Sequence, residues 1–124
     1  MSTVLIVEDN EKNMKLARDV LQAKGYGTLE AVTGEEGVKL AKEKAPDLVL
    51  MDIQLPGING IEAFRQIRAD PNTARIPVVA LTASVTPTDR SQITAAGFDA
   101  FVSKPINLKE FLDTVKRLVE AAKA

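Results

Sequence analysis

Short runs of apolar residues recur along the chain, and the central one is the most informative. Leu48–Asp52 consists of four apolar residues followed by a carboxylate, with no alternation of polar positions. A run of this kind is typical of a strand buried on both faces of a parallel sheet. Thr3–Val7 and residues 77–82 have the same character, while Gly27–Ala31 and Ala100–Ser103 are weaker runs. We therefore predict five strands.

The segments between and after these strands carry apolar residues at every third or fourth position. This spacing places them on one face of an α-helix, and the last segment shows it most clearly. The residues expected on inner helix faces are Met14, Ala17, Val20 and Leu21, then Val38, Ala41 and Ala45, then Ile61, Phe64 and Ile67, and finally Leu108, Phe111, Leu112, Val115, Leu118, Val119 and Ala122. A further short helix is expected to end at Gly97.

Polar and turn-forming residues mark where these helices begin and end. Asn10, Thr33, Thr86 and Asn107 are candidate N-caps, and Glu36 completes a capping box with Thr33. The expected stops are Gly25, Pro46, the Asp70-Pro71-Asn72 segment and Gly97. Five strands therefore alternate with five helices, which predicts an α/β fold with a parallel sheet and helices on both faces.

The length of 124 residues fits one domain with one hydrophobic core. No repeat, linker or low-complexity stretch interrupts the pattern, so we expect residues 1–124 to form a single domain without an output domain. No apolar run approaches the length of a membrane span, and no signal peptide is evident. We therefore expect a cytoplasmic protein with no membrane insertion.

Composition limits the available chemistry. The chain has no cysteine and no histidine, which excludes disulfides, thiolate catalysis and the commonest general base. Sixteen basic and seventeen acidic residues give a formal net charge of -1, so nucleic acid is not expected as a partner. Carboxylates, hydroxyls, amides, lysines and arginines remain, and carboxylate oxygens suit a hard ion such as Mg²⁺.

Polar side chains follow four of the predicted strands. Glu8 and Asp9 come after the first strand, Asp52 ends the central one, Thr82 ends the fourth and Lys104 follows the last. The carboxyl ends of parallel strands meet at one edge of a sheet, so these residues are expected to converge. Each alone has an ordinary explanation as a cap, a turn or a surface charge. Together they predict a site of three carboxylates, one hydroxyl and one ammonium group.

These residues and their neighbours resemble the receiver domain of bacterial response regulators over nearly the whole chain. The resemblance is carried by Glu8-Asp9-Asn10, residues 51–56, Thr82-Ala83 and Lys104-Pro105. Similarity to small single-domain regulators of cell-cycle or developmental control lies in residues 7–10, 13–16 and 76–79. The family implies a flavodoxin-like, doubly wound fold of five βα units, with the strand order 2-1-3-4-5.

The resemblance also assigns roles around Asp52, which it makes the acceptor of a phosphoryl group. Asp9 and Asp52 would bind Mg²⁺ directly, and the backbone carbonyl of Gln54 would be a further ligand. Glu8 would act through a metal-bound water. Gln54 and Ser84 would flank the water that hydrolyses the acyl phosphate.

The remaining roles concern the phosphoryl oxygens and a switch. Lys104 would pair with one oxygen, Thr82 would donate a hydroxyl hydrogen bond to another, and Ala83 would offer its backbone N–H. Movement of Thr82 would let Phe101 turn inward and alter the surface of the fourth helix, fifth strand and fifth helix. The alternative is that Phe101 is simply a core residue. The resemblance also suggests a cis Lys104-Pro105 bond.

The resemblance implies two kinds of protein partner. A sensor histidine kinase or a histidine phosphotransfer protein would supply the phosphoryl group. A downstream protein would bind the surface of the fourth helix, fifth strand and fifth helix. The chain would be a phosphoacceptor rather than an enzyme, with weak self-phosphorylation and autodephosphorylation activity.

Three other interpretations stay open at this point. A Mg²⁺-dependent hydrolase of the haloacid-dehalogenase type also phosphorylates an aspartate, but it usually has a second acid where this chain has Gln54. A flavodoxin-like cofactor binder needs a phosphate-cradling loop after the first strand, where Glu8 and Asp9 would repel phosphate. The third is a receiver that binds its partners without being phosphorylated.

Overall fold

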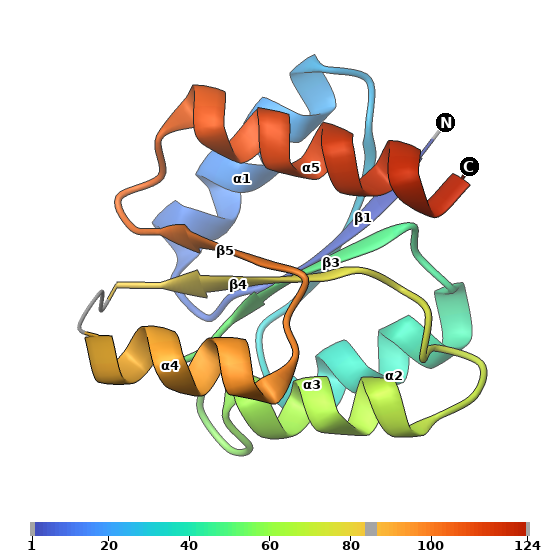
Figure 1. The fold of residues 1–124 in the computed structure, drawn as a ribbon. Coiled ribbons are helices and arrows are strands. Elements are labelled where there is room, and N and C mark those ends of the chain that lie inside the picture. The colour runs from blue at the N-terminus through green and yellow to red at the C-terminus, as the bar shows by residue number, and fades with distance from the viewer. Residues whose placement is uncertain (1, 84–86, 124) are drawn as a thin grey trace.

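The five predicted strands are present in a computed structural model that describes residues 2–83 and 87–123. They are β1 (Thr3–Val7), β2 (Gly27–Ala31), β3 (Leu48–Asp52), β4 (Val78–Thr82) and β5 (Ala100–Ser103). All neighbouring strands pair in parallel, in the order β2-β1-β3-β4-β5 (Figure 1). The predicted α/β class and strand order are confirmed.

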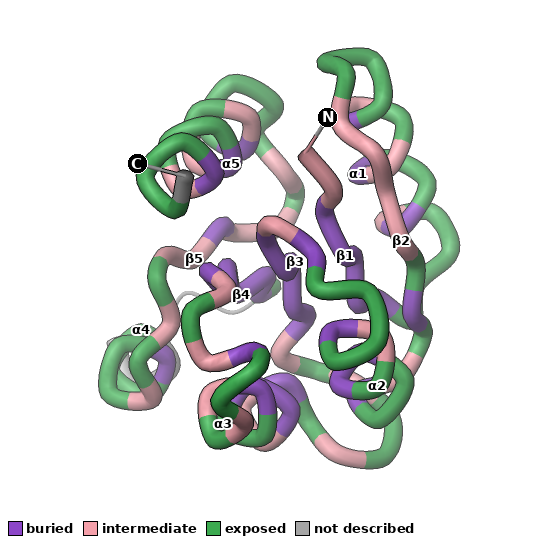
Figure 2. The backbone as a smooth tube through the Cα atoms, turned by 90° about the vertical axis from the view of Figure 1, so that its right-hand side faces the viewer, coloured by how far each residue is buried: buried purple, intermediate pink, exposed green. Residues whose placement is uncertain are grey.

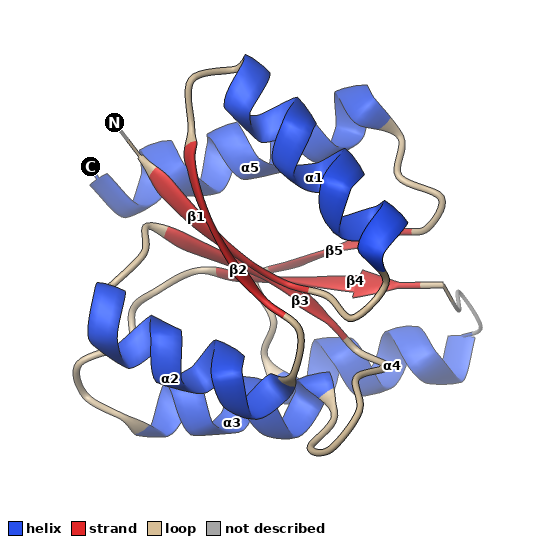
Figure 3. Cartoon of the chain, turned by 180° about the vertical axis from the view of Figure 1, so that it is seen from behind, coloured by secondary structure: helices blue, strands red, loops and turns tan. Residues whose placement is uncertain are grey.

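Five helices connect and cover the strands. They are α1 (Glu11–Ala23), α2 (Gly34–Lys44), α3 (Gly60–Ala69), α4 (Pro87–Ala96) and α5 (Leu108–Lys123). Helices α1 and α5 cover one face of the sheet, and α2, α3 and α4 cover the other (Figures 1 and 3). Every helix within the described residues is too short or too polar to span a lipid bilayer.

The helix starts follow the capping residues read from the sequence. The side-chain oxygens of Asn10, Thr33 and Asn107 each accept a hydrogen bond from the backbone N–H three residues later. These bonds satisfy N–H groups that have no partner within the helix. Asn59 caps α3 in the same way, with Glu62 as the donor. The cap predicted at Thr86 lies outside the described residues.

The two faces of the sheet bury two separate groups of side chains. Val4 and Ile6 of β1 belong to the group beneath α1 and α5, whereas Leu5 and Val7 belong to the group against α2 and α3. All four side chains are 0 % exposed. This is the expected result for a strand with no polar alternation. Figure 2 shows that burial is concentrated in the central strands of the sheet.

Three helix positions expected to face inward are exposed instead. Ala45 is exposed because it is the C-cap of α2, with a left-handed backbone (φ 45°) that turns the chain away. Leu108 opens α5 and is 48 % exposed, since the apolar stripe meets the sheet only from Phe111 onward. Ala122 lies in the last turn of α5 and is exposed. Four further positions are only partly buried: Val20, Ile61, Leu112 and Leu118.

Candidate functional site

The carboxyl ends of the strands bring the predicted site residues to one edge of the sheet. Asp52 is the last residue of β3 and pairs in register with Leu81 of β4. Thr82 follows Leu81 and pairs with Ser103 of β5, next to Lys104. The backbone N–H of Lys104 donates to the carbonyl of Thr82 over 2.8 Å. The parallel register therefore places these residues side by side, as predicted.

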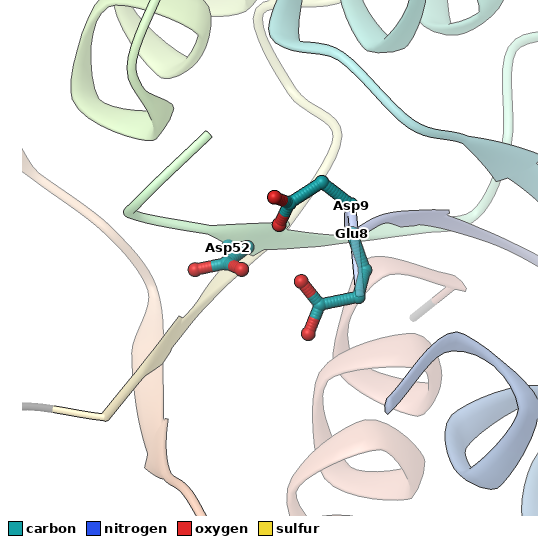
Figure 4. Close-up of side chains that lie close together, drawn as sticks. All are labelled: Glu8, Asp9 and Asp52. Carbon is teal, nitrogen blue, oxygen red and sulfur yellow. The ribbon is translucent and has the colours of Figure 1, made fainter. Parts of the chain in front are cut away.

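Three carboxylates converge at this edge. Glu8, Asp9 and Asp52 each contribute one oxygen to a group in which all atoms lie within 4.8 Å of one another (Figure 4). Glu8 is 1 % exposed and Asp52 is 5 % exposed. Asp9 is exposed. The cluster therefore has a buried floor and an open side.

In the part of the chain that the structure describes, one lysine lies against the two buried carboxylates. Lys104 Nζ is 2.5 Å from Glu8 Oε1 and 3.0 Å from Asp52 Oδ2. Among residues 2–83 and 87–123, none hydrogen-bonds the second oxygen of Glu8, Oε2, which is buried. A buried carboxylate oxygen without a partner is costly. One ammonium group thus faces an excess of negative charge.

Burial and this charge excess shift the ionisation of the site. Burial, together with the neighbouring Asp52, raises the pKa of Glu8 to about 7, although Lys104 opposes the rise. Burial alone would lower the pKa of Lys104, but hydrogen bonds to Glu8 and Asp52 outweigh it and raise that pKa above its ordinary value. Lys104 therefore stays charged, and Glu8 takes up a proton at a higher pH than an ordinary glutamate does.

The backbone after β3 fixes the orientation of Asp52. The N–H of Gln54 donates to Asp52 Oδ1 over 3.0 Å, which leaves Oδ2 facing Lys104. The loop after β3 brings Gly60 back beside the end of this strand, where the N–H of Gly60 donates to the carbonyl of Ile53. A Cβ on Gly60 would lie 2.2 Å from the backbone oxygen of Asp52. This contact depends on the folded loop, so no local sequence pattern indicates it.

The donor set fits a hard divalent cation. Carboxylate and backbone carbonyl oxygens are the ligands that Mg²⁺ prefers. Glu8 Oε2 is buried without a partner, and one lysine cannot neutralise three carboxylates. A cation at this edge of the sheet would meet both needs.

The remaining predicted residues occupy different surroundings. Thr82 is 5 % exposed at the end of β4, and Ala83 beside it is exposed. Phe101 is partly buried on β5, and its ring centroid is 5.3 Å from Arg90 Cζ of α4. The Lys104-Pro105 bond is cis, as the resemblance suggested. Ser84 lies outside the described residues.

Comparisons with known proteins agree with this geometry. Residues 4–116 match the family described as the response regulator receiver domain. The polar-differentiation response regulator DivK of Brucella ovis is 46 % identical over 114 residues, which are 92 % of this chain and 93 % of that protein.

Solved structures show the same likeness. A putative response regulator from Chloroflexus aurantiacus superposes with a TM-score of 0.92 at 29 % identity, covering 96 % of this chain and 98 % of that one. The receiver domain of a sensor histidine kinase from Pseudomonas aeruginosa, with a magnesium ion coordinated in its active site cleft, has a TM-score of 0.90 at 33 % identity and the same coverage.

Proposed function

The chain belongs to the response regulator receiver domain family, and from that premise we propose that Asp52 accepts its phosphoryl group. The position of Asp52 supports this assignment most strongly. Its carboxylate is 5 % exposed at the end of β3, 3.0 Å from the Lys104 ammonium group. Two more carboxylates share the same edge of the sheet. The chain is thus a receiver domain of a two-component system.

Transfer to Asp52 needs no histidine on this chain. A carboxylate oxygen attacks the phosphorus while the P–N bond to the partner's phosphohistidine breaks, and the electron pair of that bond stays on the imidazole nitrogen. The product is an acyl phosphate on Asp52. Charge develops on the oxygens of the transferring group, so the protein contributes mainly position and positive charge. Gln54 orients Asp52 through its N–H, and Lys104 supplies a fixed cation.

We propose that Mg²⁺ is held by Asp9, Asp52 and the backbone carbonyl of Gln54, with Glu8 acting through a metal-bound water. When bound, the ion supplies positive charge that neutralises the carboxylates and the transferring group. The partnerless Oε2 of Glu8 and the open side at Asp9 support this arrangement. The magnesium ion in the related receiver from Pseudomonas aeruginosa supports the choice of metal.

We propose that Lys104, Thr82 and Ala83 bind the phosphoryl oxygens through an ammonium group, a hydroxyl and a backbone N–H. Movement of Thr82 would be transmitted to Phe101, whose neighbour in register is Ala80 of β4. Inward rotation of the Phe101 ring would break its contact with Arg90 and so change the surface formed by α4, β5 and α5. Relaxation measurements at Phe101 with and without a phosphoryl mimic test this step, and an unchanged ring environment would contradict it.

The partners follow from the same proposal. A sensor histidine kinase or a histidine phosphotransfer protein donates the phosphoryl group in the cytoplasm, and a downstream protein binds the surface of α4, β5 and α5. Residues 1–124 act as one receiver domain. The likeness to DivK, named a polar-differentiation regulator, supports a role in developmental or cell-cycle control. We also propose that the chain is a phosphoacceptor rather than an enzyme, with weak self-phosphorylation and autodephosphorylation activity.

The family match argues against two of the other interpretations. A dehalogenase-type hydrolase lacks support because position 54 is an exposed glutamine, not an acid. A flavodoxin-like cofactor binder lacks support because Glu8 and Asp9 place negative charge where a phosphate would bind. A receiver that works without phosphorylation is distinguished by the following experiment.

Intact mass after incubation with Mg²⁺ and a small acyl-phosphate donor tests the acceptor directly. The native protein should gain the mass of one phosphoryl group, and Asp52→Asn should gain none. A chelator should abolish the gain. An equal gain in Asp52→Asn would refute Asp52 as the acceptor. No gain in either protein, repeated with a phosphorylated histidine-containing donor, would favour a receiver that works without phosphorylation.

A further inference from the structure

The loop that follows Asp52 is held from the side by the first turn of α2. Glu35 lies in that turn, and its Oε1 accepts a hydrogen bond from the backbone N–H of Ile58 over 3.2 Å. The two residues are 23 positions apart, so this bond joins separate segments of the chain. Glu35 is exposed and contributes nothing to the buried core.

Two glycines allow this close approach. A Cβ on Gly57 would lie 2.6 Å and 2.8 Å from the two carboxylate oxygens of Glu35, and Gly57 has a φ of +74° that disfavours other residues. A Cβ on Gly34 would lie 2.7 Å from Ile58 Cγ1 and 2.8 Å from its carbonyl oxygen. The absent side chain of Gly34 therefore lets the helix start approach the backbone of the loop, and that of Gly57 leaves room for the Glu35 carboxylate.

The same loop is already tied to Asp52 at both of its ends. At its beginning, the N–H of Gln54 donates to Asp52 Oδ1 over 3.0 Å. At its far end, Gly60 packs against the backbone of Asp52 and donates to Ile53. The contact from Glu35 falls between these two points and limits how the middle of the loop can move. Among the loop residues, Gln54 carries the carbonyl assigned to the metal.

We propose that Glu35 is a positioning residue for the metal site. By accepting the hydrogen bond from the N–H of Ile58, it keeps the loop in the conformation that presents the carbonyl of Gln54 beside Asp52. The inference rests on the proposed function, because the loop conformation matters only if Gln54 is a ligand. Glu35 itself touches neither the metal nor the phosphoryl group. Its effect should therefore appear in the affinity for Mg²⁺ rather than in the chemistry at saturating Mg²⁺.

Three substitutions separate the reach of Glu35 from its charge. Glu35→Gln keeps an acceptor oxygen at the same reach and removes the charge. Glu35→Asp keeps the charge at the helix start but shortens the side chain by one methylene, so it cannot reach Ile58 without backbone movement. Glu35→Ala removes both. Glu36→Ala is the matched control, since Glu36 is an exposed acid in the same turn.

The measurement is the Mg²⁺ concentration that gives half-maximal phosphorylation by a small acyl phosphate, checked by direct calorimetric titration with Mg²⁺. We expect this half-maximal Mg²⁺ concentration to rise about fivefold in Glu35→Ala and Glu35→Asp, because each loses one modest hydrogen bond. Glu35→Gln and Glu36→Ala should stay within about twofold of the native value. The rate at saturating Mg²⁺ should change little in any variant. A merely structural role would lower the unfolding free energy and leave this concentration unchanged.

The outcomes distinguish this inference from the proposed function. If the native protein binds Mg²⁺ and is phosphorylated, but Glu35→Ala and Glu35→Asp match Glu36→Ala, the positioning role is overturned and the proposed function stands. If Glu35→Gln weakens binding while Glu35→Asp does not, the charge and not the hydrogen bond is responsible, and the inference is again overturned. A native protein that does not bind Mg²⁺ would overturn both.

Discussion

Three carboxylates face one lysine at the edge of the sheet, so neutralising one of them should stabilise the metal-free protein. Asp9→Asn is the most suitable change because Asp9 is exposed, and because asparagine has nearly the same shape. It removes one negative charge without creating a cavity. The same change should weaken Mg²⁺ binding if Asp9 is a ligand. The effect on stability is therefore expected to reverse when Mg²⁺ is added.

The size of the effect follows from the distances. Two unit charges at the 4.8 Å limit of the cluster repel by about 1 kcal/mol in a water-like medium and by about 3 kcal/mol near a protein surface. Lys104 offsets part of this repulsion, and solvent screens the exposed Asp9. We therefore expect Asp9→Asn to raise the metal-free unfolding free energy by about 1 kcal/mol, or the melting temperature by about 4 °C.

Added Mg²⁺ should reverse the order of stability. At a concentration about 100 times its dissociation constant, a ligand stabilises the native state by about 2.7 kcal/mol. Loss of one direct ligand that weakens binding about a hundredfold would remove about 2 kcal/mol of this stabilisation. The variant should then be about 1 kcal/mol less stable than the native protein in excess Mg²⁺.

Urea denaturation followed by far-ultraviolet circular dichroism, in a chelator and in excess Mg²⁺, measures both differences. Asp113→Asn is the matched control, because Asp113 is an exposed aspartate of α5 outside the carboxylate cluster. It should change stability by a few tenths of a kcal/mol under both conditions. A metal-free Asp9→Asn that is no more stable than the native protein would refute the repulsion argument. An unchanged response to Mg²⁺ would remove Asp9 from the ligand set.

Further predictions concern ionisation, the loop after β3 and the core. Burial raises the pKa of Glu8 to about 7, so the folded metal-free state binds this proton more tightly than the unfolded state. The stabilisation from this proton is thus complete below the ordinary pKa of about 4.5 and is lost as the pH rises through about 7. Denaturation at several pH values should show the unfolding free energy falling over this range. Glu8→Gln should remove this pH dependence. Gly60→Ala should lower the unfolding free energy by about 1–3 kcal/mol, since its Cβ would lie 2.2 Å from the backbone oxygen of Asp52. Phe64→Ala should cost about 3–5 kcal/mol in urea denaturation, because Phe64 is 2 % exposed and stacks on Phe98.

The strands and the main site residues were predictable because their signals are local. Leu48–Asp52 is an unbroken apolar run that ends in a charge, and this pattern marks both a buried strand and the residue at its end. The carboxyl-edge rule then places Glu8 and Lys104 beside Asp52, although they are 96 positions apart in the chain. Local pattern and one topological rule were sufficient for this part of the site.

The rest of the site depends on contacts between distant segments, which no local pattern encodes. Glu35 reads as an ordinary acid in the first turn of a helix, yet its carboxylate holds Ile58 in the folded protein. Gly57 reads as a turn former, while its missing side chain makes room for that carboxylate. The prediction that Ala45 lies on the inner face of α2 was wrong for a related reason. Helical periodicity does not show where the backbone becomes left-handed and the helix ends.

The charge balance of the site supports a link between metal binding and the proposed phosphorylation of Asp52. Asp52 and Glu8 are buried against a single lysine, and the cluster already carries more negative than positive charge. Phosphorylation would replace the single charge of the Asp52 carboxylate by a phosphoryl group of about two negative charges, a net gain of about one. Lys104 alone cannot offset this addition, so we expect a bound divalent cation to be a condition for the proposed modified state. Removal of the metal should therefore prevent phosphorylation by lowering the affinity of the site for the transferring group, even though Asp52 itself is unchanged.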